Sequence, residues 1–95
     1  MLTSKQRAAL RAMANTIEPI LYVGKAGLTQ NILTQADEAL TARELIKGSV
    51  QQNAPVSAKE ALEALCSAAK AEPVSVSGRK FVLYRRNEKE PVIKM

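Results

Sequence analysis

A short apolar stretch that passes through two glycines into a helical pattern constrains the fold of this chain more than any other feature. Residues 19–23 are rich in apolar, β-branched and aromatic side chains, which is typical of a buried strand. From Thr29 onward, apolar residues recur at the spacing of an α-helix. The turn between them reads Val23-Gly24-Lys25-Ala26-Gly27-Leu28-Thr29. The stretch therefore predicts a strand that turns directly into a helix.

The same turn is the first candidate binding site. Gly24 and Gly27 have no Cβ, so the backbone can approach a ligand closely. The helix start that follows offers unpaired N–H groups and a partial positive charge, and Lys25 adds a full charge. Together these groups predict a site for a phosphate-bearing partner. The alternative is a tight strand-to-helix turn with a solvated lysine.

A nucleotide-hydrolysing P-loop is not expected at this turn. That motif needs an additional glycine before the turn, and a Ser or Thr directly after the lysine to bind magnesium. Pro19 occupies the position of that glycine, and Ala26 occupies the position of the hydroxyl residue.

The charge balance indicates an anionic partner. The 95 residues fit one compact domain, and a hydrophobic content of 46% favours a globular fold. Fourteen basic residues against nine acidic ones give a net charge of +5, which on so small a domain most often indicates nucleic acid. A merely soluble basic protein is the alternative. We expect a single domain over residues 1–86 and a loosely ordered charged tail over residues 87–95.

The residue inventory argues against an enzyme, a metal site and a membrane protein. The chain has no histidine and one cysteine, Cys66, which excludes an internal disulfide and a His or multi-Cys metal site. The carboxylates are scattered, with no pair at an evident shared site for acid–base chemistry. No apolar run approaches the ~18 residues of a membrane span, and no apolar signal core follows the basic N-terminus. We therefore expect a cytoplasmic, non-catalytic protein with no cofactor, metal, membrane or small-molecule substrate.

The first helix should begin at Thr3 or Ser4 and end before Pro19, because a residue that precedes proline disfavours the helical conformation. Thr3 and Gln6 fit a capping box. Four apolar residues at helical spacing should face the core: Leu10, Met13, Ala14 and Ile17.

Basic residues follow one side of this helix. Arg7 and Arg11 are one turn apart, so both should project from the same face, with Lys5 near its edge. A solvated helix face is the alternative to a binding role.

A second helix, capped by Thr29, should reach residue 41 or 42. Its expected apolar stripe consists of Ile32, Leu33, Ala36 and Leu40. Residues 43–50 read as a second strand, so the strand–helix–strand order predicts two parallel strands with a right-handed crossover. Gly48 marks either a bulge or a close backbone approach in this strand.

Ser57 and Glu60 form another capping box, which predicts a third helix over residues 58–71. Its expected buried side consists of Ala61, Leu62, Leu65, Cys66 and Ala69. Cys66 is interpreted as a small core residue, since no histidine is present to activate it.

Residues 73–77 and 80–85 flank a Gly78-Arg79 turn and predict a β-hairpin. Val74 and Val76 should share the drier face of its first strand. In the second strand, we expect Phe81 and Leu83 on one face and Val82 and Tyr84 on the other. Burial is the expected role of the two tyrosines, Tyr22 and Tyr84, and stacking on a base is the alternative.

The predicted order of elements is α-β-α-β-α-β-β. The economical arrangement is an α/β two-layer sandwich (α+β), with a four-stranded mixed sheet and all three helices on one face. This arrangement leaves the other sheet face open to solvent or to a partner.

Four segments resemble the YhbY-like family, also called the CRM domain, in order and spacing over residues 1–86. They are Leu2-Thr3-Ser4-Lys5-Gln6-Arg7, the glycine turn, Ala42-Arg43-Glu44-Leu45-Ile46-Lys47 and Val82-Leu83-Tyr84-Arg85. The resemblance implies a fold similar to the C-terminal domain of translation initiation factor 3. It also implies RNA binding through a loop compared with the Gly-x-x-Gly loop of KH domains. Stand-alone bacterial members associate with precursors of the large ribosomal subunit, and plant members carry the domain in intron-splicing factors.

By position, Gly24, Lys25, Ala26 and Gly27 fall on the signature loop of the family. Arg7 and Arg11 lie in the segment that resembles its basic first helix. Gly48-Ser49 departs from the family pattern because it interrupts a strand that usually continues there, often with another basic residue. An RNA contact from the end of this strand therefore stays open.

The leading hypothesis is a monomeric, non-catalytic RNA-binding protein that assists assembly of the large ribosomal subunit. The glycine turn would hold RNA phosphates, and further cations would extend the track: Lys5, Arg7, Arg11, Arg43 and Lys47. The alternative is a protein-interaction module that docks on a ribosomal or RNA-processing factor through the open sheet face. A winged-helix-like DNA binder with residues 77–80 as the wing is a third hypothesis.

Overall fold

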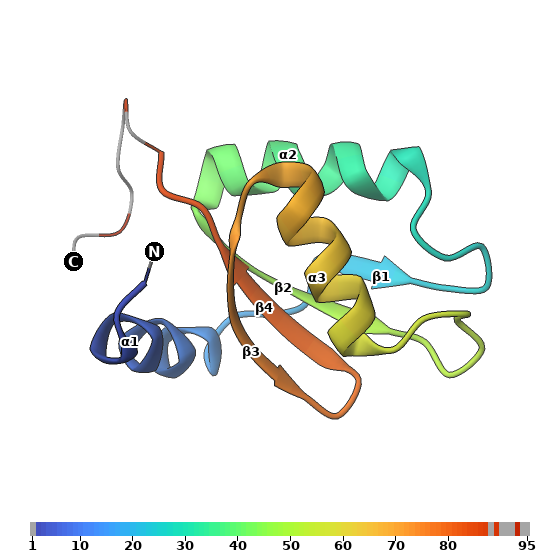
Figure 1. Ribbon diagram of the computed structural model, residues 1–95, viewed down its shortest axis with the longest axis horizontal. Helices are drawn as coiled ribbons and strands as arrows, with labels where there is room; N and C mark the ends of the chain where they lie inside the picture. The colour runs from blue at the N-terminus through green and yellow to red at the C-terminus, as the bar shows by residue number, and fades with distance from the viewer. Residues whose placement is uncertain (1, 88, 90–92, 94–95) are drawn as a thin grey trace.

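Three helices and a four-stranded sheet make up the fold (Figure 1). The computed structural model describes residues 2–87, 89 and 93. The helices are α1 (Ser4–Ala14), α2 (Gln30–Arg43) and α3 (Ala58–Ala69), and the strands are β1 (Leu21–Val23), β2 (Leu45–Val50), β3 (Glu72–Ser77) and β4 (Lys80–Tyr84). The predicted order of elements and the α+β class with a mixed sheet are confirmed.

Local signals fix where the helices begin. Thr3, Thr29 and Ser57 each accept a hydrogen bond from the backbone N–H three residues ahead, as N-caps do. The capping boxes with Gln6 and Glu60 are both complete. The predicted helix starts are therefore confirmed.

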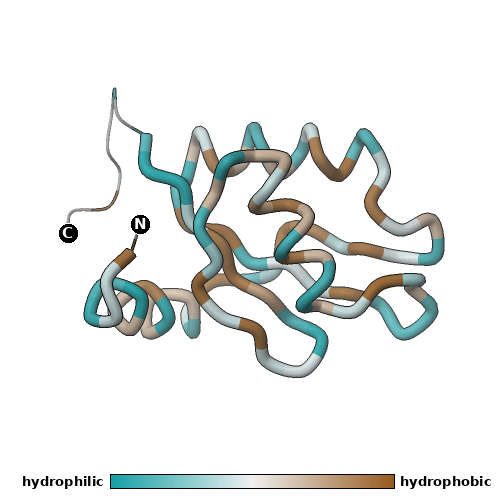
Figure 2. Tube along the Cα trace, in the orientation of Figure 1, coloured by the Kyte–Doolittle hydropathy of each residue, from teal (hydrophilic) through white to brown (hydrophobic). Residues whose placement is uncertain are grey.

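The strands lie in the order β1-β2-β4-β3. β1 and β2 pair in parallel, as the strand–helix–strand pattern predicts, and the other two pairs are antiparallel. The Gly78-Arg79 turn joins β3 to β4 as the predicted hairpin, with Gly78 at a positive φ of 60°. Figure 2 shows apolar residues along the sheet and hydrophilic residues in the loops at its ends.

One face of the sheet is covered by α2 and α3. The core on this side contains Leu21, Val23, Ala36, Leu40, Ile46, Val50, Leu62, Leu65, Phe81 and Leu83, all 4% exposed or less. Gly48 lies directly beneath the ring of Phe81, where a Cβ would come within 2.2 Å of the Phe81 Cζ. The close backbone approach predicted at Gly48 is confirmed, but β2 continues through Ser49 to Val50, so an interruption at this point is wrong.

The prediction that all three helices lie on one face is wrong, because α1 packs on the opposite face. Leu10 and Ala14 of α1 contact a second core with Leu45, Val82 and Tyr84. The physical reason lies in β4, which carries large apolar side chains on both of its faces. Two covered faces satisfy that pattern, whereas one would leave Val82 and Tyr84 in water. In Figure 1, α1 lies apart from the layer formed by α2 and α3.

Several residues differ from their predicted surroundings. Met13 is 42% exposed instead of buried, and Ile17 is only half-buried at the edge of the second core. In α3, Cys66 and Ala69 are half-buried. Arg43 ends α2 and does not start β2, because the helix runs one to two residues beyond its expected end.

Val74 and Val76 do not share a face of β3. The register against β4 shifts between Pro73 and Ser75, and this irregularity turns the strand. Val74 enters the core beside α1, whereas Val76 pairs with Phe81 on the other face and is 42% exposed.

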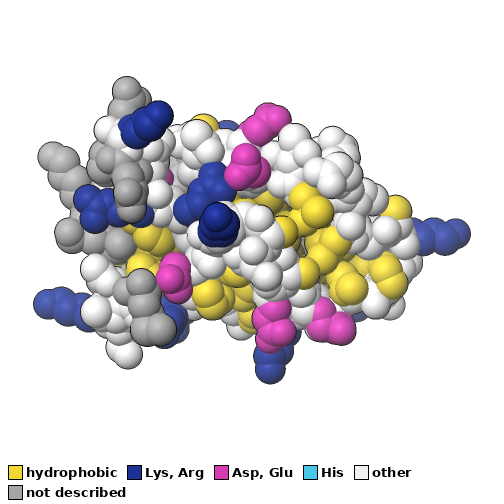
Figure 3. Space-filling model, turned by 45° about the horizontal axis from the view of Figure 1, so that its top comes forward, with side chains coloured by type: hydrophobic (Ala, Val, Ile, Leu, Met, Phe, Trp, Pro, Cys, Tyr) yellow, Lys and Arg dark blue, Asp and Glu magenta, His cyan; other side chains and the backbone are white. Residues whose placement is uncertain are grey.

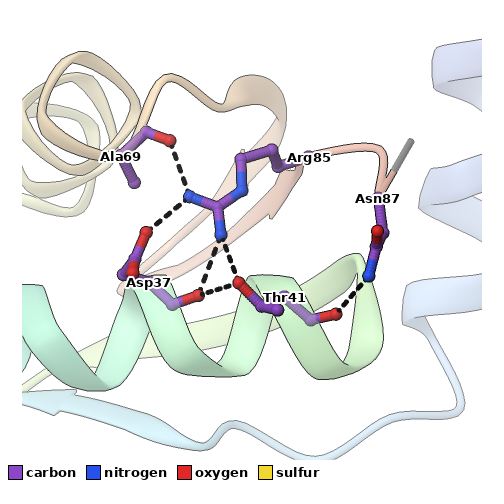
Figure 4. A network of polar contacts seen from close by, with 5 residues as sticks. All are labelled: Asp37, Thr41, Ala69, Arg85 and Asn87. Carbon is purple, nitrogen blue, oxygen red and sulfur yellow. Dashed lines mark hydrogen bonds and ion pairs between the residues drawn. The ribbon is translucent and has the colours of Figure 1, made fainter. Parts of the chain in front are cut away.

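Arg85 connects both helices of the first layer to the end of β4 (Figure 4). Its guanidinium donates to the carboxylate and the carbonyl of Asp37, at 2.7 and 2.9 Å. It also donates to the Thr41 hydroxyl at 2.8 Å and to the carbonyl of Ala69, at the end of α3, at 2.9 Å. The planar group thus satisfies acceptors on two helices at once.

Glu44 is fully buried between α2 and β2 and holds the chain beyond β4. Its φ of 65° is unusual for a residue with a side chain. Its carboxylate accepts the backbone N–H groups of Asn87 at 2.5 Å and Ile93 at 2.6 Å. Most of the predicted tail lies outside the described residues, so its loose order stays a prediction.

We expect Gly48→Ala to lower the free energy of unfolding by about 1–3 kcal/mol, because the new methyl group overlaps the Phe81 ring. Urea unfolding measures this change. Ser49→Ala, on the opposite face of the same strand, is the control and should change stability by less than about 0.5 kcal/mol. Equal stability of Gly48→Ala and the native chain would contradict the packing described here.

We expect Arg85→Lys to cost about 1–3 kcal/mol of stability, since an ammonium cannot reach four acceptors spread over two helices. The exposed neighbour provides a matched control, Arg86→Lys, with little effect in the same urea experiment. The Asp37 side chain is 63% exposed, so Asp37→Asn should cost less than about 1 kcal/mol. If Asp37→Asn lowered the free energy of unfolding as much as Arg85→Lys, the ion pair, and not the hydrogen bonds to the two helices, would account for the stabilisation by Arg85.

Candidate nucleic-acid interface

The glycine turn forms a compact loop with an exposed tip. The Gly27 N–H donates to the Gly24 carbonyl at 2.9 Å, which closes the turn. Lys25 and Ala26 at the tip are exposed, whereas Gly27 is buried. Thr29 then caps α2 by accepting the Ile32 N–H at 3.2 Å. The loop thus presents a lysine next to the N-terminus of a helix, as the sequence predicts.

The two glycines of the turn differ in their structural role. Gly27 has a φ of 73°, and a Cβ on it would lie 3.1 Å from the Pro55 ring in the loop between β2 and α3. A Cβ on Gly24 would meet only the flexible end of the Gln51 side chain, at 2.9 Å. Gly27 is thus required for the turn itself, and Lys25 and Ala26 are the exposed residues of the loop, next to the half-buried Gly24.

The basic residues of α1 lie at the other end of the molecule. In Figure 1, α1 and the loop between β1 and α2 stand at opposite ends of the longest axis, which spans 36 Å. Lys5 and Arg11 are exposed, and the Arg7 guanidinium donates to the carbonyl of Pro73 at 3.3 Å. The glycine turn and the α1 cations therefore do not form one compact cluster.

A groove on the α1 side of the sheet contains further cations. It has a volume of about 430 Å³, and its lining includes Arg11, Lys47, Lys80, Ser75 and Ser77, with no carboxylate among its lining residues. The Lys47 ammonium donates to the Ala14 carbonyl at the C-terminal end of α1, at 3.3 Å. The structure thus brings Arg11 and Lys47 together, as the sequence predicts for one track.

Arg43 stands apart from that groove. It lines a neighbouring pocket of about 310 Å³ that is largely apolar and also contains Met13, Ile17 and Glu18. Lys47 lines both the groove and this pocket, so Arg43 has Lys47 as a neighbour but does not share the groove with Arg11.

Charge is separated between the two faces of the sheet. The α1 helix carries three basic residues and no acidic one, whereas α2 and α3 together carry four acidic and two basic residues. Figure 3 shows acidic side chains spread over the helical side, with basic side chains among them as well as at both ends of the molecule. An anionic partner is therefore attracted to the α1 side and the two ends.

Sequence reasoning missed Lys80 as part of this surface. Its position beside the hairpin turn was visible, but its neighbours depend on the pairing of β4 with β2, where Lys80 lies opposite Ser49. The signal that would have found it is the alternation of β4, which places Lys80 on the same face as Val82 and Tyr84.

A metal site or a reactive thiol among the described residues would point to catalysis. No group of three or more Cys, Asp or Glu side chains is placed to hold a metal ion in that part of the chain. Burial, with a smaller effect of the Glu72 charge, raises the pKa of the Cys66 thiol to about 11. The thiol is therefore protonated and unreactive at neutral pH. Within the described ranges, no helix has both the length and the apolar character needed to cross a membrane.

Comparison with known proteins connects this geometry to a family. The sequence model of the CRS1 / YhbY (CRM) domain matches residues 2–85. The chain is 40% identical to the probable RNA-binding protein YqeI of Bacillus subtilis (strain 168), covering 100% of this chain and 99% of that protein. It is 31% identical to an RNA-binding protein of Haemophilus influenzae, covering 96% of this chain and 92% of the relative. The solution structure of SAV1595 from Staphylococcus aureus has a TM-score of 0.77 and 44% identity, with 90% of each chain covered.

We expect Cys66 in the folded protein to react with a thiol reagent at pH 8 on the order of 100-fold more slowly than an unhindered cysteine, because so little thiolate is present. The rate should keep rising as the pH approaches about 11. Stopped-flow measurement with a colorimetric disulfide reagent tests this, and the chain unfolded in urea is the control. Equal rates for the folded and unfolded chain would contradict the raised pKa of the half-buried Cys66 thiol.

Proposed function

Because the chain belongs to the CRS1 / YhbY (CRM) domain family, we propose that it is a non-catalytic RNA-binding protein. The relatives whose names state an activity are named as RNA-binding proteins. The observation in this chain that carries the proposal is the separation of charge across the sheet, which concentrates cations beside α1 and in the groove below it. A polyanion is the partner that such a surface attracts.

In this proposal, two groups of cations bind different phosphates of the RNA. Lys25 at the exposed tip of the loop pairs with one phosphate, next to the N-terminus of α2. Arg11, Lys47 and Lys80 accept phosphates in the groove, and Lys47 still has N–H donors beyond the one that Ala14 uses. Lys5 and Arg7 extend this row of phosphate-binding cations along α1. Arg43, which lines the neighbouring pocket, lies at the edge of the row.

The alternatives have less support. A protein-interaction module would need a wide apolar sheet face, but α1 covers part of that face, and three cations, Arg11, Lys47 and Lys80, line the groove beside α1. A winged-helix DNA binder leaves the exposed lysine of the glycine turn without a role.

We further propose that the RNA belongs to precursors of the large ribosomal subunit and that the protein acts as a cytoplasmic monomer. The support for this part is the family resemblance, in which stand-alone bacterial members have that association. Sedimentation of the protein with ribosomal particles, followed by sequencing of cross-linked RNA, tests it. Cross-links confined to messenger or transfer RNA would contradict it.

Lys25→Gln is expected to weaken binding of a single-stranded RNA about fivefold at about 0.1 M salt, because one phosphate contact is lost. The slope of log K against log salt should also become shallower by about 0.7. Fluorescence anisotropy with a labelled oligonucleotide measures both quantities. Lys70→Gln, at the C-cap of α3 on the helical side, is the matched control and should change neither.

Arg11→Gln should have the same two effects as Lys25→Gln, since it removes a charge from the groove. If Lys25→Gln and Arg11→Gln both bind like Lys70→Gln, the phosphate contacts proposed here are wrong. If the native chain binds no RNA, the proposed function itself is wrong.

A further inference from the structure

A part of the sheet face on the α1 side is left uncovered. The helix packs over Leu45, Val82 and Tyr84, but the register places another row of residues beyond its reach. Tyr22 lies opposite Ser49, Ser49 opposite Lys80, and Lys80 opposite Ser77. These four residues, called here the Tyr22 row, cross all four strands on one face.

Tyr22 is the largest side chain of the Tyr22 row, and its ring is held in place in solvent. It is 56% exposed, which overturns the expectation that it is buried. Its hydroxyl donates to the Pro19 carbonyl at 3.0 Å, so the ring is tied to the backbone just before β1. An aromatic side chain fixed in advance loses little conformational entropy when it binds a partner.

The neighbours of Tyr22 are hydroxyls and cations. Lys80 is two strands away from Tyr22, at a distance of about 10 Å set by the spacing between strands. Lys80 and Ser77 also line the groove that contains Arg11 and Lys47, so the Tyr22 row and the groove are continuous. Along the chain, Lys25 follows Tyr22 by three residues.

We propose that the Tyr22 row binds a single-stranded segment of RNA, with one base stacked on Tyr22 and the adjoining phosphates on Lys80 and Lys47. This inference rests on the proposed function and adds a contact that involves no phosphate. It connects the exposed loop tip at Lys25 to the cations beside α1, which are otherwise separated along the longest axis.

The chemistry of the surface favours a single strand over other occupants. An aromatic ring with cations at its margin is the arrangement on which unpaired bases stack, whereas the bases of a duplex are already stacked on each other. A protein partner would instead meet two lysines and an arginine, with no carboxylate among the lining residues to balance their charge. Charge complementarity thus favours a single-stranded polyanion.

Tyr22 can be observed directly, because the chain has no tryptophan and only two tyrosines. Tyr84 is 4% exposed, and replacing it by phenylalanine leaves Tyr22 as the one tyrosine emitter. Titration of Tyr84→Phe with a twelve-nucleotide oligouridine should quench this emission. If anisotropy shows that oligouridine binds to saturation but the Tyr22 emission does not change, the proposal is wrong. The surface would then be a site for a different partner, such as a protein.

Affinity measurements separate stacking from charge. Tyr22→Ala should weaken oligouridine binding about 5- to 100-fold without a change in the salt slope, whereas Tyr22→Phe, which keeps the ring and loses only the bond to Pro19, should weaken it much less. Gln35→Ala removes an exposed side chain from α2, on the opposite face, and is the control. Duplex RNA and an abasic oligonucleotide should bind Tyr22→Ala and the native chain equally.

Each outcome distinguishes this inference from the proposed function. If the native chain binds oligouridine and Tyr22→Ala binds it equally well, stacking is wrong and RNA binding stands. If Tyr22→Ala weakens duplex and abasic binding as much as oligouridine binding, the ring supports the fold and does not stack on a base. Absence of any RNA binding by the native chain would overturn both.

Discussion

The two-sided burial of β4 is the constraint on which the rest of this structure depends. Phe81 and Leu83 face α2 and α3, while Val82 and Tyr84 face α1, and all four are 5% exposed or less. A strand with apolar side chains on both faces is stable only when other elements of the fold pack against both faces. Because α1 is the one helix left for the second side, the chain places its basic helix on a different face from its two acidic helices.

The candidate interface follows from that division. Since α1 packs over Leu45, Val82 and Tyr84, it leaves the groove with Arg11, Lys47 and Lys80 accessible, together with Tyr22 beyond it. The sheet thus supplies a rigid platform, and the loop with Lys25 extends it at one end. Binding groups on strands are held more precisely than groups on loops alone.

Local signals made much of this fold predictable from the sequence, and long-range pairing accounts for what was missed. Caps at Thr3, Thr29 and Ser57 and the glycine turn act over three or four residues, so their structures could be read directly. The side of the sheet that α1 covers depends on contacts between residues far apart in the sequence, as does the exposure of Tyr22. The φ of 65° at Glu44 follows no local rule, because its carboxylate is held by N–H groups more than forty residues away.

Backbone amide chemical shifts of the labelled protein, followed during titration with a single-stranded RNA, test the central claim most directly. The account predicts that shifts change at residues 22–29, in the second half of α1, at residues 47–49 and at residues 77–80, with the outer surfaces of α2 and α3 unchanged. Changes concentrated on α2 and α3, with the α1 side unaffected, would contradict it.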